Sequence, residues 1–400
     1  MSYIPSEEVL NKYADVLINF ALGSEKGIKK GDVVFLQVPE CARPILVPLR
    51  NAVLKAGGHP IIQYLPDSMT REFFELASPA QLDFFPAKYL KGKVDEADHN
   101  LLILAEEDPH ELEGIDPAKI MRTSRAFKPY KDWRIQKEIE GKFTWVLALY
   151  GTPAMAKEAK MSLEEYWNEI INACYLDEDD PKTTWVEISN KISKIKNKLN
   201  KLEIEHLHIL SENTDLIVAL GSDRQWLSGG GRNIPSFEIF TSPDWRGTQG
   251  HITFTEPLYI YGNLVENVYL EFENGIVQNA KATKGEKFLH EMLKVEHANK
   301  IGEFSLTDSS LSRITKFMGH TLFDENVGGK YGNTHIALGS SFKETYKGDS
   351  KKVSDEEWEL MGFNNSAVHT DIVSTENRKV VATLLNGSEL VIYENGHFTL

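Results

Sequence analysis

Short apolar runs alternate with amphipathic segments over the first half of the chain. Helical spacing is found at 9–20 and 44–56, and the second of these segments stops at Gly57-Gly58. Strand-like apolar runs cover 32–38, 60–64, 101–105 and 143–149. This alternation predicts parallel strands joined by crossover helices, and the near-continuous apolar runs indicate a sheet covered on both faces. We therefore expect an α/β N-terminal domain with a parallel sheet.

The pattern changes in the second half, where strand-like runs are separated by tight turns. Asn274-Gly275 lies between the runs 268–273 and 276–282, and Asn386-Gly387 lies between 380–385 and 389–393. Asn-Gly between β-rich runs is a strong hairpin signal. We expect an α+β, largely antiparallel C-terminal domain, with a helix at 287–293.

The chain has 400 residues, enough for two domains of ordinary size. The acidic run Asp177-Glu178-Asp179-Asp180-Pro181 precedes the change of pattern and is a candidate linker. We place the N-terminal domain at 1–180 and the C-terminal domain at 181–400.

Composition narrows the class of protein. The chain is 41% hydrophobic and carries a net charge of -15, which fits a soluble globular protein and argues against a protein that binds a nucleic-acid backbone. The local lysine cluster at 191–201 alternates with Ile192, Ile195, Leu199 and Leu202, which indicates a helix with one solvated basic face.

The cellular compartment is predicted from three features that the sequence lacks: a disulfide framework, a signal peptide and a membrane span. Two cysteines, Cys41 and Cys174, provide no disulfide framework, which favours a reducing compartment. The start of the sequence lacks the regions of a signal peptide, and no apolar run approaches the length of a membrane span. We expect a cytoplasmic protein that contacts neither membranes nor nucleic acid.

Candidate chemistry begins with His369 and Asp371, two residues apart in a predicted strand. Side chains at i and i+2 share one strand face, so an imidazole and a carboxylate would point the same way and could hold a divalent metal ion. Further carboxylates and a histidine precede them: Glu238, Glu303, Glu325 and His335. Mixed histidine and carboxylate ligands suit zinc, cobalt or manganese. The long gaps between these residues leave ordinary core or surface roles open.

Other motifs are weaker. The segments Gly229-Gly230-Gly231-Arg232 and Gly328-Gly329-Lys330 lack the remainder of a phosphate-binding loop, and we interpret them as turns. The chain has no Gly-x-Ser-x-Gly motif for a serine hydrolase. Cys41 is interpreted as a buried thiol, and His206 with His208 as polar positions at a strand edge.

Five motifs in order resemble the aminopeptidase T family of dinuclear-metal aminopeptidases, which includes aminopeptidase S. The first is Asn233-Ile-Pro-Ser-Phe-Glu-Ile-Phe-Thr-Ser-Pro243, similar to the family's Asn-x-Pro-x-x-Glu-Val-Phe-Thr-x-Pro. Gly302-Glu303, Leu322-Phe-Asp-Glu-Asn326, His335-Ile-Ala-Leu-Gly339 and Asn365-Ser-Ala-Val-His-Thr-Asp371 follow. The motifs cover roughly residues 200–385, and five in the right order are specific.

The resemblance implies two divalent metal ions, a peptide substrate with a free N-terminus, and a homodimer. The implied metal ligands are Glu238, Glu303, His335, His369 and Asp371, with Glu303 as the bridging carboxylate. Glu325 would be a further ligand or an acid/base group.

Two departures from the family pattern bear on activity. The segment Val327–Thr334 is longer than in many members and could reshape the pocket or displace Glu325. A family tyrosine that helps to stabilise the transition state aligns with Phe342, which cannot donate a hydrogen bond; Tyr346 is the nearby substitute.

We therefore expect a metallo-aminopeptidase whose catalytic residues include Glu303, Glu325 and Tyr346. Two alternatives stay open at this point: a metal-dependent hydrolase of other specificity, and a catalytically silent binding homologue.

Overall fold

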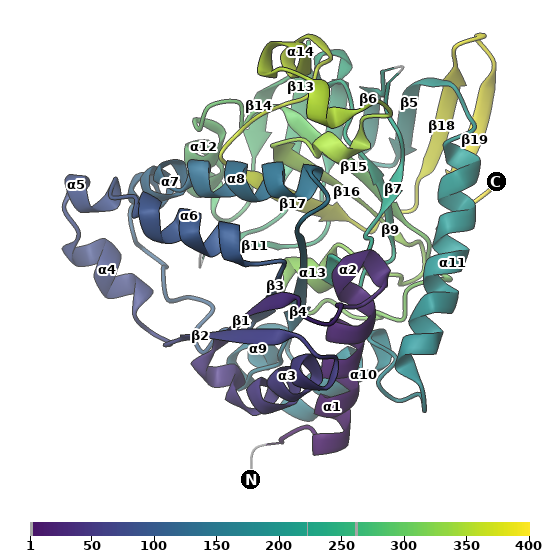
Figure 1. The fold of residues 1–400 in the computed structure, drawn as a ribbon. Coiled ribbons are helices and arrows are strands. Elements are labelled where there is room, and N and C mark those ends of the chain that lie inside the picture. The colour runs from purple at the N-terminus through teal and green to yellow at the C-terminus, as the bar shows by residue number, and fades with distance from the viewer. Residues whose placement is uncertain (1–2, 222, 261–262) are drawn as a thin grey trace. The chain divides into compact units, whose positions relative to one another are not determined.

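The computed structural model describes residues 3–221, 223–260 and 263–400 (Figure 1). Within these residues the chain forms two compact units. The first comprises Met1–Ile115, Ala126–Asn190 and Gly229–Ser236, and the second comprises Asp116–Arg125, Lys191–Ser228 and Phe237–Leu400. The main change of unit falls at 190, ten residues after the expected boundary at 180, and each unit also holds a short segment from the other's part of the sequence.

The first unit is built on a parallel sheet of order β2-β1-β3-β4-β8. Its strands are β1 (Val33–Pro39), β2 (His59–Leu65), β3 (His99–Leu104), β4 (Thr144–Leu149) and β8 (Asn233–Ile234). The four longer strands coincide closely with the apolar runs of the first half of the sequence. The short β8 comes from the Gly229–Ser236 segment and pairs with β4.

Helices cover both faces of this sheet (Figure 1). The helices of this unit are α1 (Glu7–Val16) with its π-helical continuation (Leu17–Ala21), α2 (Leu22–Glu25), α3 (Arg43–Lys55), α4 (Thr70–Leu76), α5 (Pro79–Leu82), α6 (Ala87–Glu96), α8 (Lys128–Ile139), α9 (Pro153–Glu158), α10 (Leu163–Ala173) and the first half of α11 (Pro181–Leu199). On β1, Val34, Leu36 and Val38 are fully buried, whereas Phe35 lies under the ammonium of Lys93 from α6. Alternate residues of one strand thus serve the two helical layers.

The second unit is antiparallel. One sheet has the order β14-β13-β10-β6-β5-β18-β19-β20. Its strands are β5 (Ile204–Ser211), β6 (Thr214–Ala219), β10 (Gln249–Thr253), β13 (Tyr269–Glu273), β14 (Ile276–Lys281), β18 (Lys379–Leu384), β19 (Glu389–Glu394) and β20 (His397–Phe398). Both hairpins expected from Asn-Gly occur here, β13–β14 and β18–β19.

A second antiparallel sheet has the order β17-β16-β15-β9-β7. Its strands are β7 (Leu227–Ser228), β9 (Glu238–Thr241), β15 (Ile301–Thr307), β16 (Asn333–Gly339) and β17 (His369–Ser374). The remaining elements of the unit are β11 (Leu258–Ile260), β12 (Asn263–Val265), α7 (Pro117–Ala126), α12 (Glu286–Leu293), α13 (Thr321–Asp324) and α14 (Asp355–Leu360). Every residue of β15 and β16 is buried, so their polar side chains lie inside the unit.

The expected fold class is confirmed, with a parallel α/β part followed by a largely antiparallel part. None of the helices in the described part of the chain is both long and apolar enough to cross a membrane.

Candidate metal centre

The register of β17-β16-β15-β9 brings the predicted metal-binding residues onto one sheet face. Glu303 on β15 pairs with Ala337 on β16, and Ala337 pairs with Asp371 on β17. Paired residues in adjacent strands point to the same side, as do residues two apart along a strand. His335 therefore shares this face through Ala337, and so does His369 through Asp371. The two carboxylates therefore lie on either side of Ala337.

Glycines shape the edge of this site. A bulge interrupts the pairing of β15 with β16 between Ile301 and Glu303. A Cβ atom at Gly302 would lie 2.4 Å from the carbonyl oxygen of Ser340, and one at Gly339 would lie 2.3 Å from that of Val368. Only glycine fits such close backbone approaches. The Gly302-Glu303 motif thus sets the register that directs Glu303 into the site.

Glu303 lies between two imidazoles. Its Oε1 is 3.5 Å from Nε2 of His335, and its Oε2 is 3.2 Å from Nε2 of His369. Glu238 completes the first side, with Oε2 at 3.3 Å from Nε2 of His335. Asp371 completes the second side, with Oδ1 at 3.4 Å from Nε2 of His369.

Two groups of candidate ligands result among the described residues, and both contain Glu303. One is Glu238, Glu303 and His335, and the other is Glu303, His369 and Asp371. Within each group the ligand atoms lie within 4.8 Å of one another. The structure therefore brings together five of the six residues predicted as metal ligands.

The chemistry of these donors fits a divalent metal ion. Imidazole nitrogen and carboxylate oxygen are ligands for zinc, cobalt and manganese. Within the described part of the chain, Nδ1 of His335 and Oδ1 of Asp371 are buried without a hydrogen-bond partner. Nδ1 of His369 lies 2.7 Å from the carbonyl oxygen of Ser340, which can only accept, so this nitrogen carries the proton. Nε2 of His369 is then the nitrogen that faces the carboxylates, and it becomes available to a metal ion when it loses its proton.

Electrostatics favour a cation at this site. Burial alone would lower the pKa of both histidines, but Asp371 and Glu303 raise the pKa of His369 to about 10. Glu238 and Glu303 likewise outweigh the burial of His335 and hold its pKa well above the usual value. A proton and a metal ion compete for the same imidazole lone pair, so carboxylates that attract the proton also attract the metal.

Glu325 lies close to these residues but outside both groups. It caps the C-terminal end of α13 and is buried. Burial, followed by the nearby charges of Asp371 and Glu238, raises its pKa well above the usual value. The segment Val327–Thr334 has therefore not moved Glu325 away from the cluster.

The structure does not bring Tyr346 to the cluster. Residues 340–346 are not one helix: Phe342 is extended, and only a short 3-10 turn, Lys343–Thr345, precedes Tyr346. The ring of Tyr346 packs against Trp358 and Phe363, with centroids 5.4 Å and 6.4 Å away. Phe342 instead contacts the imidazole of His369. The expected substitution of Tyr346 for the family tyrosine stays a prediction.

Two positioning residues carried no ligand signal in the sequence. Asn326 is fully buried; its Oδ1 accepts from the amide of Phe237 at 2.6 Å, and its Nδ2 lies 3.4 Å from Oε1 of Glu325. It thereby connects the residue before Glu238 with Glu325. Ala337 belongs to a sequence motif that gives it no role. The cross-strand pairing places it between Glu303 and Asp371.

The weaker motifs have structural roles. A Cβ atom at Gly231 would lie 2.1 Å from the carbonyl oxygen of Ala21, and Arg232 pairs with Glu138 at 2.9 Å, so this segment is a packed turn. Cys41 is half-buried and not fully buried as expected. Burial, followed by the nearby Asp67 carboxylate, raises the pKa of its thiol to about 12, which disfavours the nucleophilic thiolate. His208 pairs with Asp215 across β5 and β6 at 2.7 Å, away from the metal cluster.

Comparison with known proteins agrees with the geometry. A family model described as "Thermophilic metalloprotease (M29)" matches residues 6–398. The chain is 28% identical to aminopeptidase T of Thermus aquaticus, covering 98% of this chain and 99% of that protein. It is 26% identical to aminopeptidase PepS of Streptococcus thermophilus, covering 98% of each.

A solved structure described as wild-type AmpT from Thermus thermophilus shares the fold. The TM-score is 0.83 at 24% identity, over 98% of this chain and 100% of that chain. With a family model that spans nearly the whole sequence and a buried histidine–carboxylate cluster, the chain belongs to the M29 family of thermophilic metalloproteases.

Proposed function

We propose that this chain is a metallo-aminopeptidase that removes N-terminal residues from peptides through a dinuclear metal centre. The observation that carries the proposal is the position of Glu303, whose two carboxylate oxygens face different imidazoles. Membership of the M29 family and the names of its full-length relatives support the reaction class.

Each metal ion would have its own pair of ligands in addition to Glu303. Glu238 and His335 would hold one ion, and His369 and Asp371 the other, with Glu303 as the bridge. Two divalent cations would balance the carboxylates of Glu238, Glu303, Glu325 and Asp371, which lie together with little access to water. Zinc, cobalt and manganese are the candidate metals for this donor set. When bound, such a pair of ions supplies Lewis-acid polarisation of the scissile carbonyl and lowers the pKa of water.

The remaining steps fall to side chains of this chain. Glu325 lies near the cluster without belonging to either ligand group. Bound cations would favour its ionised form, and its carboxylate would then take the proton of the attacking water and deliver it to the leaving amine. The ordered Nδ1–H of His369 on Ser340 keeps the imidazole in one orientation during this transfer. Phe342 cannot donate a hydrogen bond to the developing oxyanion, so of the two candidate side chains only Tyr346 has a hydroxyl for this role, and its ring packs against Trp358 and Phe363.

The substrate would be a peptide with a free N-terminus. We further propose a homodimer that acts on short or unfolded peptides in the cytoplasm, as the family resemblance implies. Light scattering on the purified protein tests the dimer independently of any activity measurement.

Metal analysis combined with a peptide-library digest tests the proposed function. The expected result is a metal content near two per chain, together with release of N-terminal residues from free peptides but not from N-acetylated ones. Metal without such release would instead indicate a hydrolase of other specificity. Little metal and no turnover would indicate a silent binding homologue.

A further inference from the structure

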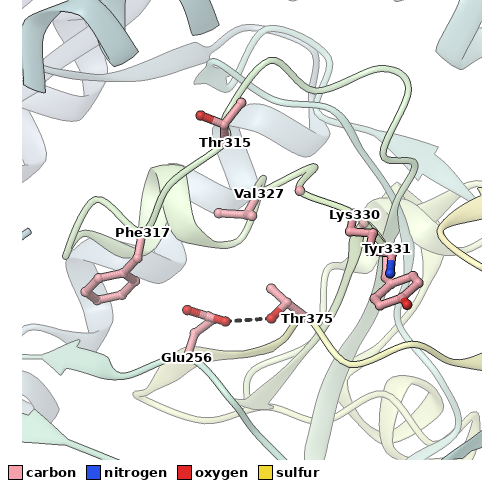
Figure 2. Close-up of a pocket in the computed structure, with 9 residues that line it drawn as sticks. Glu256, Thr315, Phe317, Val327, Lys330, Tyr331 and Thr375 are labelled. Carbon is pink, nitrogen blue, oxygen red and sulfur yellow. Dashed lines mark hydrogen bonds between the residues drawn. The ribbon is translucent and has the colours of Figure 1, made fainter. Parts of the chain in front are cut away.

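The second unit contains a cavity of ≈ 270 Å³ that none of the metal-facing residues lines. Figure 2 shows its walls. They are formed by Glu256, Thr315, Phe317, Val327, Gly329, Lys330, Tyr331, Gly332 and Thr375. Its volume lies just below the usual range of about 300–1,000 Å³ for small-molecule sites, so it suits a small ligand.

The wall that contains Val327–Gly332 is fixed by hydrogen bonds. Nδ2 of Asn333 donates to the carbonyl oxygen of Val327 at 2.8 Å and closes the loop. The hydroxyl of Tyr393 lies 3.0 Å from the carbonyl oxygen of Tyr331. A Cβ atom at Gly332 would lie 2.1 Å from the carbonyl oxygen of Thr307. The segment that is longer than in the family pattern is therefore an ordered wall, prepared for a ligand before one binds.

Glu256 presents a carboxylate to one side of the cavity. Its Oε1 accepts from Oγ1 of Thr375 at 2.6 Å and from Oγ1 of Thr255 at 3.3 Å. Its Oε2 has no hydrogen-bond donor, and the carboxylate has no lysine, arginine or histidine partner, within residues 3–221, 223–260 and 263–400. The threonines orient the carboxylate while one oxygen stays available to a cationic group.

Lys330 presents the opposite charge on another wall. Its ammonium lies 4.7 Å from the ring centroid of Tyr331, and no carboxylate pairs with it in the described part of the chain. Figure 2 shows Lys330 and Glu256 on different sides, with Thr375 between them. The cavity therefore offers an uncommitted anion and an uncommitted cation that do not neutralise each other.

Apolar groups also line the cavity. They are Val327 and Phe317, both labelled in Figure 2. Phe317 is held by stacking on Tyr259, with centroids 6.4 Å apart and an interplanar angle of 30°. An aromatic ring fixed in this way provides a surface for an aliphatic or aromatic side chain.

From this arrangement we infer that the cavity binds an α-amino-acid zwitterion. The ligand's ammonium would bind Glu256, its carboxylate would bind Lys330, and its side chain would pack on Phe317 and Val327. A free amino acid and a very short peptide share this chemistry. Both are present during peptide hydrolysis, but the site itself needs no metal ion and stands independently of the proposed function.

Occupancy of this cavity would reach segments that carry metal-facing residues. The amide of Glu256 donates to the carbonyl oxygen of Val373 on β17, two residues after Asp371. Val327 follows Glu325 by two residues in the chain. A bound amino acid therefore contacts the continuation of both segments. A sensing role, unlike the binding itself, rests on the proposed function: the cavity is placed to sense the amino acids that the enzyme releases.

Calorimetric titration of the full-length protein with L-leucine tests this inference. We expect leucine to bind both the protein as purified and the protein after chelator treatment, because none of the residues that line the cavity is a candidate metal ligand. N-acetyl-leucine and leucinamide, which lack the ammonium and the carboxylate respectively, should each bind about 10- to 100-fold more weakly, as loss of a charged hydrogen bond implies. Titration of leucyl-leucine into chelator-treated protein distinguishes a free amino acid from a short peptide as the occupant. Tighter binding of leucine assigns the cavity to free amino acids, and tighter binding of the dipeptide assigns it to short peptides.

Charge-removing variants locate the binding in the cavity. Glu256→Gln should weaken leucine binding and abolish the preference over N-acetyl-leucine, and Lys330→Met should abolish the preference over leucinamide. Glu389→Gln and Lys287→Met are matched controls on exposed residues outside the cavity and should leave the affinity unchanged. Circular dichroism of each variant shows whether it is folded. Three results would each overturn the inference. They are no leucine binding at millimolar concentration, leucine binding that is lost when the metal is removed, and leucine affinity in folded Glu256→Gln and Lys330→Met equal to that of the unchanged protein.

Discussion

The ring of Phe342 lies against the imidazole of His369, with centroids 4.8 Å apart and an interplanar angle of 68°. Phe240 supports the same ring from a centroid distance of 5.3 Å. The amide of Phe342 donates to Oγ of Ser242 at 2.8 Å, which fixes the backbone at this point. Phe342 therefore occupies a defined place beside the candidate metal centre, whereas Tyr346 packs among other aromatic rings.

A hydroxyl at position 342 should increase the rate of the chemical step. We expect Phe342→Tyr to raise kcat with little change in metal content, because the new donor would lie beside His369. A full oxyanion contact is worth ~2.7–4 kcal/mol. A stabilisation of ~2–4 kcal/mol corresponds to roughly 30- to 1,000-fold in rate, and this sets the upper range of the gain in kcat. Steady-state kinetics on aminoacyl amides measure it.

Tyr346→Phe is the paired variant. If Tyr346 contributes to the transition state, this change lowers kcat; its packing against Trp358 and Phe363 leads us to expect no such loss. Should neither substitution change kcat by about twofold, no tyrosine near this motif takes part in the chemistry.

Glu303→Gln should abolish activity while preserving the fold. The amide keeps the size of the side chain but removes the charge that the two imidazoles share. Metal analysis, turnover and thermal unfolding of the same preparation check this expectation. Turnover close to that of the unchanged protein would show that Glu303 is neither a bridge nor an acid/base group.

His369→Ala and Asp371→Ala should each lower the metal content, and added metal should restore activity poorly. Thr370→Val between them is the matched control, because Thr370 points to the opposite strand face. Its Oγ1 is buried without a hydrogen-bond partner in the described residues, so the isosteric valine loses no hydrogen bond. Equal metal loss in all three variants would indicate disruption of β17 and not the loss of ligands.

The fold was predictable where local signals and burial agree. At Asn274 and Gly275 φ is 51° and 78°, the left-handed conformation that a type I′ turn requires, so this hairpin could be located from two letters. The predicted linker at 177–181 directly precedes α11, and one compact unit extends to Asn190, so the boundary at 180 stays a prediction. Tertiary packing sets the boundaries of compact units, and an acidic run in the sequence does not by itself reveal that packing.

The candidate ligands could be proposed from the sequence, whereas the residues that position them could not. The spacing of His369 and Asp371 predicts one strand face, whereas Glu238, Glu303 and His335 were united only by the family motifs. The role of Ala337 depends on cross-strand register, which the bulge at Gly302 shifts. A one-residue shift in register moves a side chain to the opposite face, so a single sequence cannot specify these neighbours.

Asn326→Ala should weaken metal binding and activity although Asn326 touches neither ligand group. The change leaves the buried amide of Phe237 without its acceptor, which costs about 1–3 kcal/mol of folding free energy, and it releases Glu325. Loss of such supporting contacts typically lowers metal affinity or activity by about 10- to 100-fold. Asn326→Asp keeps an acceptor for Phe237, yet it should be impaired as well, because it places a buried negative charge beside Glu325 and the carbonyl oxygen of Leu322. Asn11→Ala, at an exposed position of α1, is the control and should match the unchanged protein. Metal titration and denaturant unfolding separate the two effects: reduced stability with unchanged metal affinity and kcat would assign Asn326 a purely structural role.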